Sequence, residues 1–206
     1  MPAADIAVQL QERLAGAIKR VDLGSGWFAV RQRERAAEMV RKLAEWLRTN
    51  TRVFVAAEQD FEVTIGRAVL KGQVDRLEQD PEGRLFVVDL KTGKHAPTKA
   101  QLGENAQLGS YQVAVEAGAF DEVAAGVRTS GGAALVQVGT STVKAAVNEQ
   151  KPLSDSDDPG WALAMIERSA RGMAGNVFNA IDNDMCRSCP VRTSCPVRDE
   201  GRQVTA

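Results

Sequence analysis

Two short runs of residues, 72–76 and 88–93, constrain the fold of this chain more than any other feature. They read Gly-Gln-Val-Asp-Arg and Val-Asp-Leu-Lys-Thr-Gly, and residues 80–83 between them read Asp-Pro-Glu-Gly. Proline presets φ at the second position of a turn and glycine accepts a positive φ at the fourth, so this segment predicts a hairpin. A type I turn followed by a glycine bulge then sets Asp75 opposite Asp89 on the two strands.

The predicted hairpin places two carboxylates and a lysine close together. Side chains alternate along a strand, so Asp89 and Lys91 share a face. Two facing carboxylates repel unless a cation binds between them, and a divalent metal ion is the obvious candidate. A solvated or salt-bridged hairpin is the alternative. Residues 85–90 are otherwise apolar and predict a strand buried on both faces. An unpaired carboxylate is costly there, so we favour a metal site at Asp75 and Asp89.

The order of these motifs resembles the PD-(D/E)XK nuclease superfamily. It is most similar to the RecB-type nuclease domain of bacterial helicase–nuclease complexes, including actinobacterial AdnB- and AddB-like proteins. That family carries an acidic residue, then G-x-x-D-R, then D-x-K-T-G, then a helix with Q-x-x-x-Y. The resemblance runs from about residue 50 to the last cysteine. The matching positions are Glu58, Gly72, Asp75, Arg76, Asp89, Lys91, Thr92, Gly93, Gln107 and Tyr111.

The resemblance implies metal-dependent hydrolysis of DNA phosphodiester bonds. The two aspartates and the backbone carbonyl of Leu90 would hold Mg²⁺ or Mn²⁺, and Lys91 would act on the attacking water or on charge at the phosphate. Gln107 and Tyr111, one helical turn apart, would position the DNA strand. Further implied are a helicase domain in the same polypeptide, a helicase–nuclease partner subunit, and a role in double-strand break processing and recombination repair. The implied catalytic residues are Glu58, Asp75, Asp89 and Lys91.

Three cysteines, Cys186, Cys189 and Cys195, gather within ten residues near the C-terminus. An odd number at this spacing makes a poor disulfide framework and indicates a metal site, either zinc or an iron–sulfur cluster. The alternative is a group of reduced, metal-free thiols. Both metal centres normally need four ligands. The chain's only histidine, His95, follows the Asp-x-Lys strand and makes a doubtful fourth ligand.

The family resemblance bears on the missing fourth ligand. Several RecB-type domains hold a [4Fe–4S] cluster with one cysteine upstream of the nuclease core and three at its C-terminal end. They also carry a histidine metal ligand on an N-terminal helix. This chain has neither the upstream cysteine nor that histidine. We therefore expect it to be a fragment of a longer protein, with a diverged family member as the alternative.

Composition bounds the function only loosely. The chain has 206 residues, 44% hydrophobic and 26% charged, as expected for a soluble globular domain with one sizeable core. Its net charge of −1 provides no global attraction for nucleic acid, so a local basic surface would have to do so. No apolar run is long enough to span a membrane and no signal-peptide pattern occurs, so we expect a cytoplasmic protein.

The pattern along the chain predicts a mixed α/β domain with a restriction-endonuclease-like sheet flanked by helices and a C-terminal cysteine-rich metal or Fe–S loop. We expect a helical segment over 1–50, a nuclease core over 51–180, and the cysteine cluster with a fraying polar tail over 181–206. The second predicted helix is rich in arginine, which we interpret as a solvated face balanced by glutamates more than as a phosphate-contacting one. Helices are predicted over 6–18, 27–48, 98–117 and 161–174, and strands over 52–57, 61–65, 68–77, 85–90, 133–138 and 142–147.

Two functions from other classes stay open. One is an inactive nuclease fold that guides DNA, which the absence of the upstream histidine makes plausible. The other is a zinc- or iron-binding regulatory protein in which the hairpin acids are incidental.

Overall fold

The computed structural model describes residues 3–177 and 179–202 of the chain. Phe178 and the part of the predicted polar tail beyond residue 202 therefore lie outside the described residues. The chain divides into two compact units, residues 1–167 and residues 168–206. Within the described ranges, no helix combines the length and apolar character that crossing a bilayer would require.

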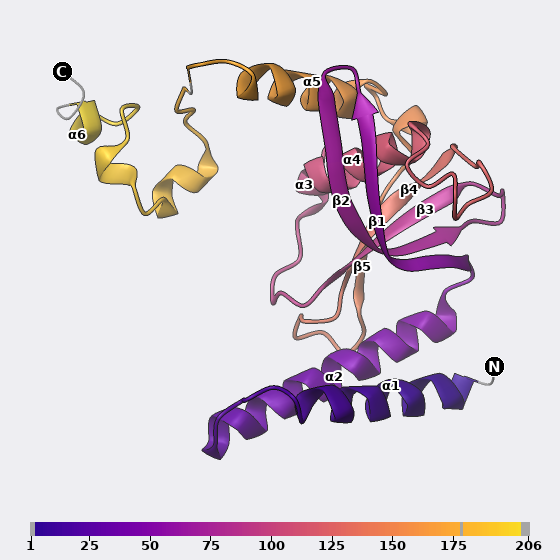
Figure 1. Ribbon diagram of the computed structural model, residues 1–206. Helices are drawn as coiled ribbons and strands as arrows, with labels where there is room; N and C mark the ends of the chain where they lie inside the picture. The colour runs from indigo at the N-terminus through magenta and orange to yellow at the C-terminus, as the bar shows by residue number, and fades with distance from the viewer. Residues whose placement is uncertain (1–2, 178, 203–206) are drawn as a thin grey trace. The chain divides into compact units, whose positions relative to one another are not determined.

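A five-stranded mixed sheet forms the centre of the first unit (Figure 1). Its strands are β1 (Val53–Ile65), β2 (Ala68–Gln79), β3 (Leu85–Lys91), β4 (Ser130–Gln137) and β5 (Ala146–Gln150), and they lie in that order. The β3–β4 pair is parallel and the other three pairs are antiparallel. The prediction of a mixed α/β fold is confirmed.

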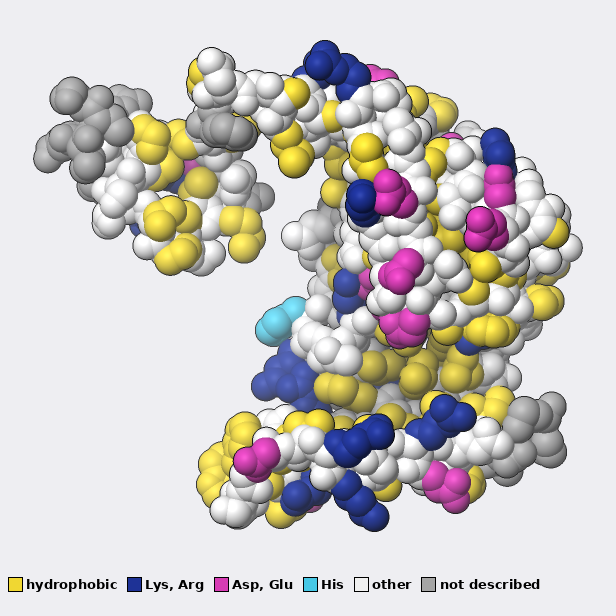
Figure 2. All heavy atoms as spheres, in the orientation of Figure 1, with side chains coloured by type: hydrophobic (Ala, Val, Ile, Leu, Met, Phe, Trp, Pro, Cys, Tyr) yellow, Lys and Arg dark blue, Asp and Glu magenta, His cyan; other side chains and the backbone are white. Residues whose placement is uncertain are grey.

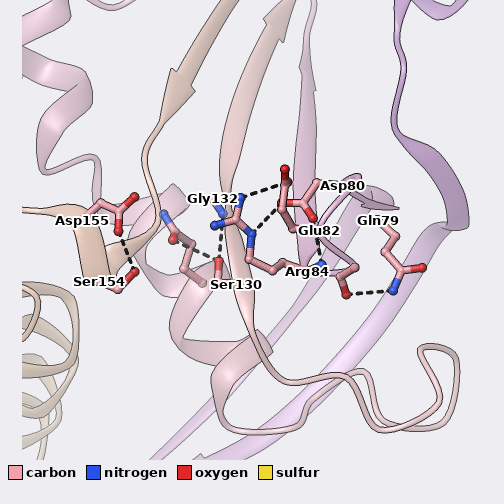
Figure 3. A network of polar contacts seen from close by, with 10 residues as sticks. Gln79, Asp80, Glu82, Arg84, Ser130, Gly132, Ser154 and Asp155 are labelled. Carbon is pink, nitrogen blue, oxygen red and sulfur yellow. Dashed lines mark hydrogen bonds and ion pairs between the residues drawn. The ribbon is translucent and has the colours of Figure 1, made fainter.

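The turn between β2 and β3 is built as predicted. Asp80 N donates to Arg84 O and Gly83 N donates to Asp80 O, both at 2.9 Å, and Gly83 has a φ of 79°. Side chains hold the same turn, because Arg84 Nε lies 2.8 Å from Asp80 Oδ2 and Gln79 Nε2 donates to Gly83 O (Figure 3). These contacts fix the register of the two strands that carry the predicted carboxylates.

Several predicted strand boundaries were wrong. Residues 52–57 and 61–65 belong to a single strand, β1, because Gln59 and Asp60 pair with Val74 and Gln73 across the ladder. The polar run that suggested a break is therefore bound by β2. The partner of β4 is residues 146–150 instead of 142–147. Strand β4 ends at Gln137, and two residues later Gly139 lies so close to Thr92 that a side chain there would be 1.9 Å from Thr92 O.

The single helix predicted over 98–117 is two helices, α3 (Lys99–Gly103) and α4 (Ala106–Glu116). Thr98 caps α3 as predicted, through a capping box with Gln101. Asn105 then caps a new helix, because its side chain accepts a 3.1 Å hydrogen bond from Leu108 N. The remaining helices of the first unit match prediction to within a few residues: α1 (Ala3–Ile18), α2 (Gly26–Thr49) and, reaching into the second unit, α5 (Trp161–Met173).

Helices cover both faces of the sheet. On one face, Leu108, Tyr111 and Val115 of α4 pack against a core that includes Leu77 and Val87. On the other, Trp46 of α2 packs against a second cluster, which Leu43 and Leu47 extend. The strand residues of that cluster are Phe86, Val88, Ala134 and Val136. Strand β3 contributes to both clusters, so its prediction as a strand buried on both faces is confirmed.

One buried polar side chain locks α4 to the sheet. The side chain of Gln112 is fully buried, and its Nε2 donates to Gln150 Oε1 and to Lys151 O. Its Oε1 accepts from Ser130 Oγ and from Leu153 N, each at 3.0 Å. One side-chain amide makes all four hydrogen bonds, and they join α4 to β4, to β5 and to the residues after β5. This network holds α4 in place against the sheet.

Beyond the end of α5, the second unit contains short helical turns around the cysteines. They are two 3₁₀ helices, Asp184–Ser188 and Arg192–Ser194, and α6 (Asp199–Arg202). Successive backbone hydrogen bonds between residues three apart join these turns, ending with Gly201 N to Arg198 O. Residues 199–202 form α6, and Gly201 is buried against the backbone of Cys195, while the predicted fraying of the tail stays a prediction.

Candidate active site

Asp75 and Asp89 lie on neighbouring strands. The β2–β3 ladder runs through the pair Arg76–Val88, so these two aspartates form the next facing positions. The backbone N–H of Leu90 donates a 2.6 Å hydrogen bond to Asp75 Oδ2, which ties the side chain of β2 to the main chain of β3. Asp89 is only 4% exposed. The structure thus brings two carboxylates to one place, with the Leu90 peptide beside them.

The carboxylate of Asp89 is held from two directions. Its Oδ1 accepts hydrogen bonds from Gln107 Nε2 at 2.7 Å and from the Tyr111 hydroxyl at 3.2 Å. Its Oδ2 lies 2.6 Å from Lys91 Nζ as an ion pair. That oxygen is buried and has no hydrogen-bond partner of regular geometry among the described residues. Residues of α4 therefore hold Oδ1 in place, and Oδ2 can still accept a hydrogen bond or bind a cation.

Tyr111 is arranged to donate to Asp89. The pKa of its hydroxyl is raised above the ordinary value of 10.0, mainly because the side chain is buried, and the charge of Asp89 adds to this effect. Gln107 Nε2 donates to the tyrosine oxygen at 2.9 Å, which acts in the opposite direction on the same pKa. The phenol stays protonated at neutral pH, so Gln107 and Tyr111 form one polar unit with Asp89.

Glu58 occupies an unusual position on β1. Its neighbours Ala57 and Gln59 pair with Arg76 and Val74, so Glu58 falls at the register position opposite Asp75. Its φ is 50°, in the left-handed region that side chains other than glycine rarely adopt. Such strain costs of order 1–3 kcal/mol and clusters at functional sites. Glu58, Asp75 and Asp89 therefore follow one another across three strands.

The donor set at this position suits a small, hard cation. Magnesium binds through one or two carboxylates and keeps several waters, and manganese accepts the same oxygen ligands. Asp75, Asp89 and the Leu90 carbonyl fit that pattern, and Oδ2 of Asp89, which is buried and contacts only the Lys91 ammonium among the described residues, is an oxygen that such an ion could use. Across residues 3–177 and 179–202, no three His, Cys, Asp or Glu side chains are gathered as a complete metal-binding group. A metal here would complete its shell with main chain and water.

A protein-family model named PD-(D/E)XK nuclease superfamily matches residues 1–196. The chain belongs to the PD-(D/E)XK nuclease superfamily. A search of curated proteins finds no match. Among solved structures, the crystal structure of SSO0001 is similar at 14% identity, over 91% of this chain and 94% of that one, with a TM-score of 0.37. A similarity that distant carries no weight for function here.

Contacts around the lysine of this PD-(D/E)XK domain include residues that the sequence did not suggest. Gln137 pairs with Lys91 in the parallel β3–β4 register, so the two side chains share a face. Gln137 is 3% exposed and its Oε1 has no hydrogen-bond partner among described residues. Arg35 of α2 donates to Thr92 O at 2.9 Å, and Val138 N donates to Lys91 O. Only the long-range pairing of β4 and the docking of α2 reveal these residues.

The cysteines lie in the second unit of the PD-(D/E)XK chain. Cys186, Cys189 and Cys195 are free and partly buried, and no metal-holding group of three such ligands occurs where the structure describes the chain. The pKa of Arg198 is raised, first by its hydrogen bond with Cys186 and next by the charge of Asp182, whose Oδ1 lies 2.6 Å away. A cation thus stands beside the thiols, but three cysteines do not complete a four-ligand site.

Proposed function

We propose that this member of the superfamily is a Mg²⁺- or Mn²⁺-dependent deoxyribonuclease that hydrolyses phosphodiester bonds at Asp75, Asp89 and Lys91. The observation that carries the proposal is the surroundings of Asp89, with Oδ1 bonded by Gln107 and Tyr111 and Oδ2 buried beside an ammonium group. Burying a carboxylate in this way is costly unless a cation balances it. A structural ion pair would not need a second carboxylate on the adjacent strand.

Each residue has a role that its position allows. Asp75, Asp89 and the Leu90 carbonyl would hold the divalent ion. When bound, the ion supplies charge neutralisation at the phosphate and a more acidic water. The Leu90 N–H keeps Asp75 oriented toward β3, and the amide and phenol of α4 keep Asp89 from rotating. The ligands are therefore set in place by the fold before substrate arrives.

The contacts of Lys91 and of its strand partner Gln137 suggest how the lysine could take part in cleavage. In the structure the ammonium contacts the same oxygen, Asp89 Oδ2, that a cation would use. Lys91 would bring its positive charge to a phosphate oxygen, where it would stabilise the transition state. Gln137 pairs with Lys91 on the next strand and has an unused acceptor, Oε1, that could hold the ammonium group in place. Glu58 would act as an auxiliary acid at the edge of the site.

We place this activity in a helicase–nuclease that processes double-strand breaks during recombination repair in the cytoplasm, as the RecB-type motif order suggests. In this proposal the cysteines provide three ligands of a structural [4Fe–4S] cluster or a zinc ion, and a fourth ligand comes from outside the trio. Arg198 beside Cys186 places a positive charge next to this group of sulfur atoms. Iron, sulfide and zinc analysis of anaerobically purified protein tests this part separately from the nuclease.

Cleavage of end-labelled single-stranded DNA in Mn²⁺ tests the nuclease proposal. Wild type should degrade the DNA, and Asp89→Ala should lower the rate at least a hundredfold. Asp121→Ala is the matched control, because Asp121 is a half-buried carboxylate outside the site that pairs with Arg128 instead of a lysine of β3. Equal rates in wild type and Asp89→Ala would contradict the proposal, and so would a wild type that binds Mn²⁺ but does not cleave.

A further inference from the structure

The N-terminal half of α2 leads from the candidate active site to two exposed aromatic side chains. Arg35 of this helix contacts the carbonyl of Thr92, the residue that follows Lys91. Eight and seven residues before Arg35 along the chain, Trp27 and Phe28 are 78% and 55% exposed, and their rings meet edge to face with centroids 6.3 Å apart. Exposing two large rings side by side is unfavourable in water, and none of the roles described above uses them.

Helix geometry connects these aromatic rings to the active site. Phe28, Arg31 and Arg35 are spaced i, i+3 and i+7, so they lie on one face of α2. This face is directed toward the end of β3, because the guanidinium of Arg35 donates a hydrogen bond to the carbonyl of Thr92. Seven residues of α-helix span about 10 Å, which corresponds to about three stacked nucleotides. The stripe thus runs outward from the active site over the length of a short stretch of single-stranded DNA.

The basic residues of α2 divide into two groups. Toward the C-terminal end, Arg41 and Arg48 pair with Glu38 and Glu45 at 2.8 and 2.7 Å, which agrees with the predicted solvated, balanced face. Arg31 differs, because its side chain is 73% exposed and its one ion pair with the described residues, to Glu34, is 3.9 Å long. An exposed pair at that distance contributes little. The guanidinium of Arg31 is therefore available to a phosphate.

The surface near the site is basic where this stripe begins. In Figure 2, Lys and Arg side chains gather directly beside His95, which follows β3 by four residues. Lys94 and His95 are both exposed. A chain with a net charge of −1 thus has a local positive surface next to its candidate active site. Such a surface complements a phosphate backbone, and it would repel the same surface of a second copy.

We propose that Trp27, Phe28 and Arg31 form a docking surface for single-stranded DNA, referred to below as the α2 arm. Unpaired bases stack on Trp27 and Phe28, and Arg31 contacts the phosphate between them and the active site. Duplex DNA cannot use the arm in this way, because its bases are already stacked in pairs. Stacking on aromatic side chains beside basic residues is how sequence-independent binders hold single strands. The inference deepens the proposed nuclease function and names its substrate class.

Intrinsic fluorescence tests the α2 arm without any cleavage. Trp46 and Trp161 are each 9% exposed, so quenching by oligo(dT) in EDTA reports mainly on Trp27. Trp27→Ala and Phe28→Ala should each weaken oligo(dT) binding about tenfold, as measured by anisotropy of labelled DNA. Trp27→Phe should restore most of the affinity, because it keeps an aromatic face. Blunt duplex of the same length should bind more weakly than oligo(dT) and should not respond to these variants.

Matched controls separate the arm from general effects. Phe54→Ala removes a phenyl ring of similar exposure on β1, and Arg48→Ala removes an arginine from the other end of α2. Both should bind oligo(dT) like wild type, whereas Arg31→Ala should bind it several-fold more weakly. Unchanged binding in Trp27→Ala and Phe28→Ala would overturn the proposal. So would a change of oligomeric mass in those variants, since the rings would then join copies of the chain.

The failure of this inference can be told from the failure of the nuclease proposal. Hydrolysis of a small chromogenic thymidine phosphodiester, compared between wild type and Asp89→Asn, concerns the active site alone, because such a substrate cannot reach Trp27. If neither protein hydrolyses it while Trp27→Ala still weakens oligo(dT) binding, the arm stands and the nuclease proposal fails. If only wild type hydrolyses it and Trp27→Ala binds oligo(dT) normally, the nuclease stands and the arm is wrong.

Discussion

The backbone N–H of Leu90 donates a 2.6 Å hydrogen bond to Oδ2 of Asp75, and this bond joins the two strands of the candidate active site. A carboxylate on β2 is thereby oriented by the main chain of β3, one residue after Asp89. The contact has two separable components. One is a structural hydrogen bond, which any acceptor of the right shape can make, and the other is a negative charge, which only a carboxylate supplies.

Substitution of Asp75 separates these components. Asp75→Asn keeps an oxygen for the Leu90 N–H but loses the charge, so it should unfold within about 0.5 kcal/mol of wild type while cleavage falls at least a hundredfold. Asp75→Ala loses both and should be about 1–2 kcal/mol less stable in urea unfolding. Substantial cleavage by the asparagine variant would show that the charge is not needed.

Glu58 should be a position where stability and activity oppose each other. Its φ of 50° disfavours every side chain, so Glu58→Gly should be about 1 kcal/mol more stable than Glu58→Ala, although both remove the carboxylate. Both should cleave DNA more slowly than wild type if the acid assists the site. Ala125, the other residue besides glycine with positive φ in the described part of the chain, provides the control for strain alone through Ala125→Gly. Equal stability of the two Glu58 variants would mean that the backbone at residue 58 is not strained by its positive φ.

Tyr111 is the only tyrosine, so its ionisation can be followed directly by ultraviolet absorbance. Burial raises the pKa of Tyr111 in the folded protein. The protonated phenol therefore contributes to the free energy of unfolding in full below about pH 10, and this contribution is lost as the pH rises through the pKa of the folded protein. In EDTA, the absorbance midpoint should lie above that of urea-unfolded protein. Asp89→Asn should lower the midpoint, because the charge and the hydrogen bond of Asp89 both raise it. A midpoint unaffected by this substitution would argue against the contact.

Because α4 and α5 pack closely at Gly109, we expect a larger residue at this position to lower the stability of the fold. A methyl group there would lie 2.4 Å from the six-membered ring of Trp161. Gly109→Ala should therefore destabilise the chain by about 1–3 kcal/mol in urea unfolding. Gly16→Ala is the matched control, since nothing lies within 4 Å of its added methyl group in α1, and alanine should stabilise that helix slightly. A neutral Gly109→Ala would mean that Trp161 can move away.

Local chemistry explains what the sequence could predict. The hairpin at 80–83 determines its own register through proline and glycine, so the opposition of Asp75 and Asp89 follows from residues close together in the chain. Helix α2 shows a long helical pattern, and both α2 and α5 agree with the predicted bounds to within a few residues, although the apolar residues of α5 form no clean single stripe. The break between α3 and α4 had a signal in the sequence, the Asn105 cap, which the prediction of one helix from Thr98 overlooked.

Other features depend on contacts between distant segments. Strand β4 ends where Gly139 meets Thr92, so the start of β5 could not be read from residues 139–150 alone. Gln137 enters the site only through the parallel pairing of β4 with β3, about 45 residues upstream. The resemblance suggested Gln107 and Tyr111 as DNA-positioning residues, and the structure adds that both bind Asp89. Whether either also contacts DNA stays a prediction.

The most direct test of the account compares Mn²⁺ affinity and DNA cleavage in Lys91→Met. Lys91 contacts the oxygen that a cation would use, so its removal should leave Mn²⁺ binding as tight as in wild type or tighter, by calorimetry. Cleavage of single-stranded DNA at saturating Mn²⁺ should nevertheless fall a hundredfold or more, because the charge that stabilises the transition state is gone. If Lys91→Met binds Mn²⁺ and cleaves DNA at the wild-type rate, Asp89 and Lys91 are a structural ion pair and not part of an active site.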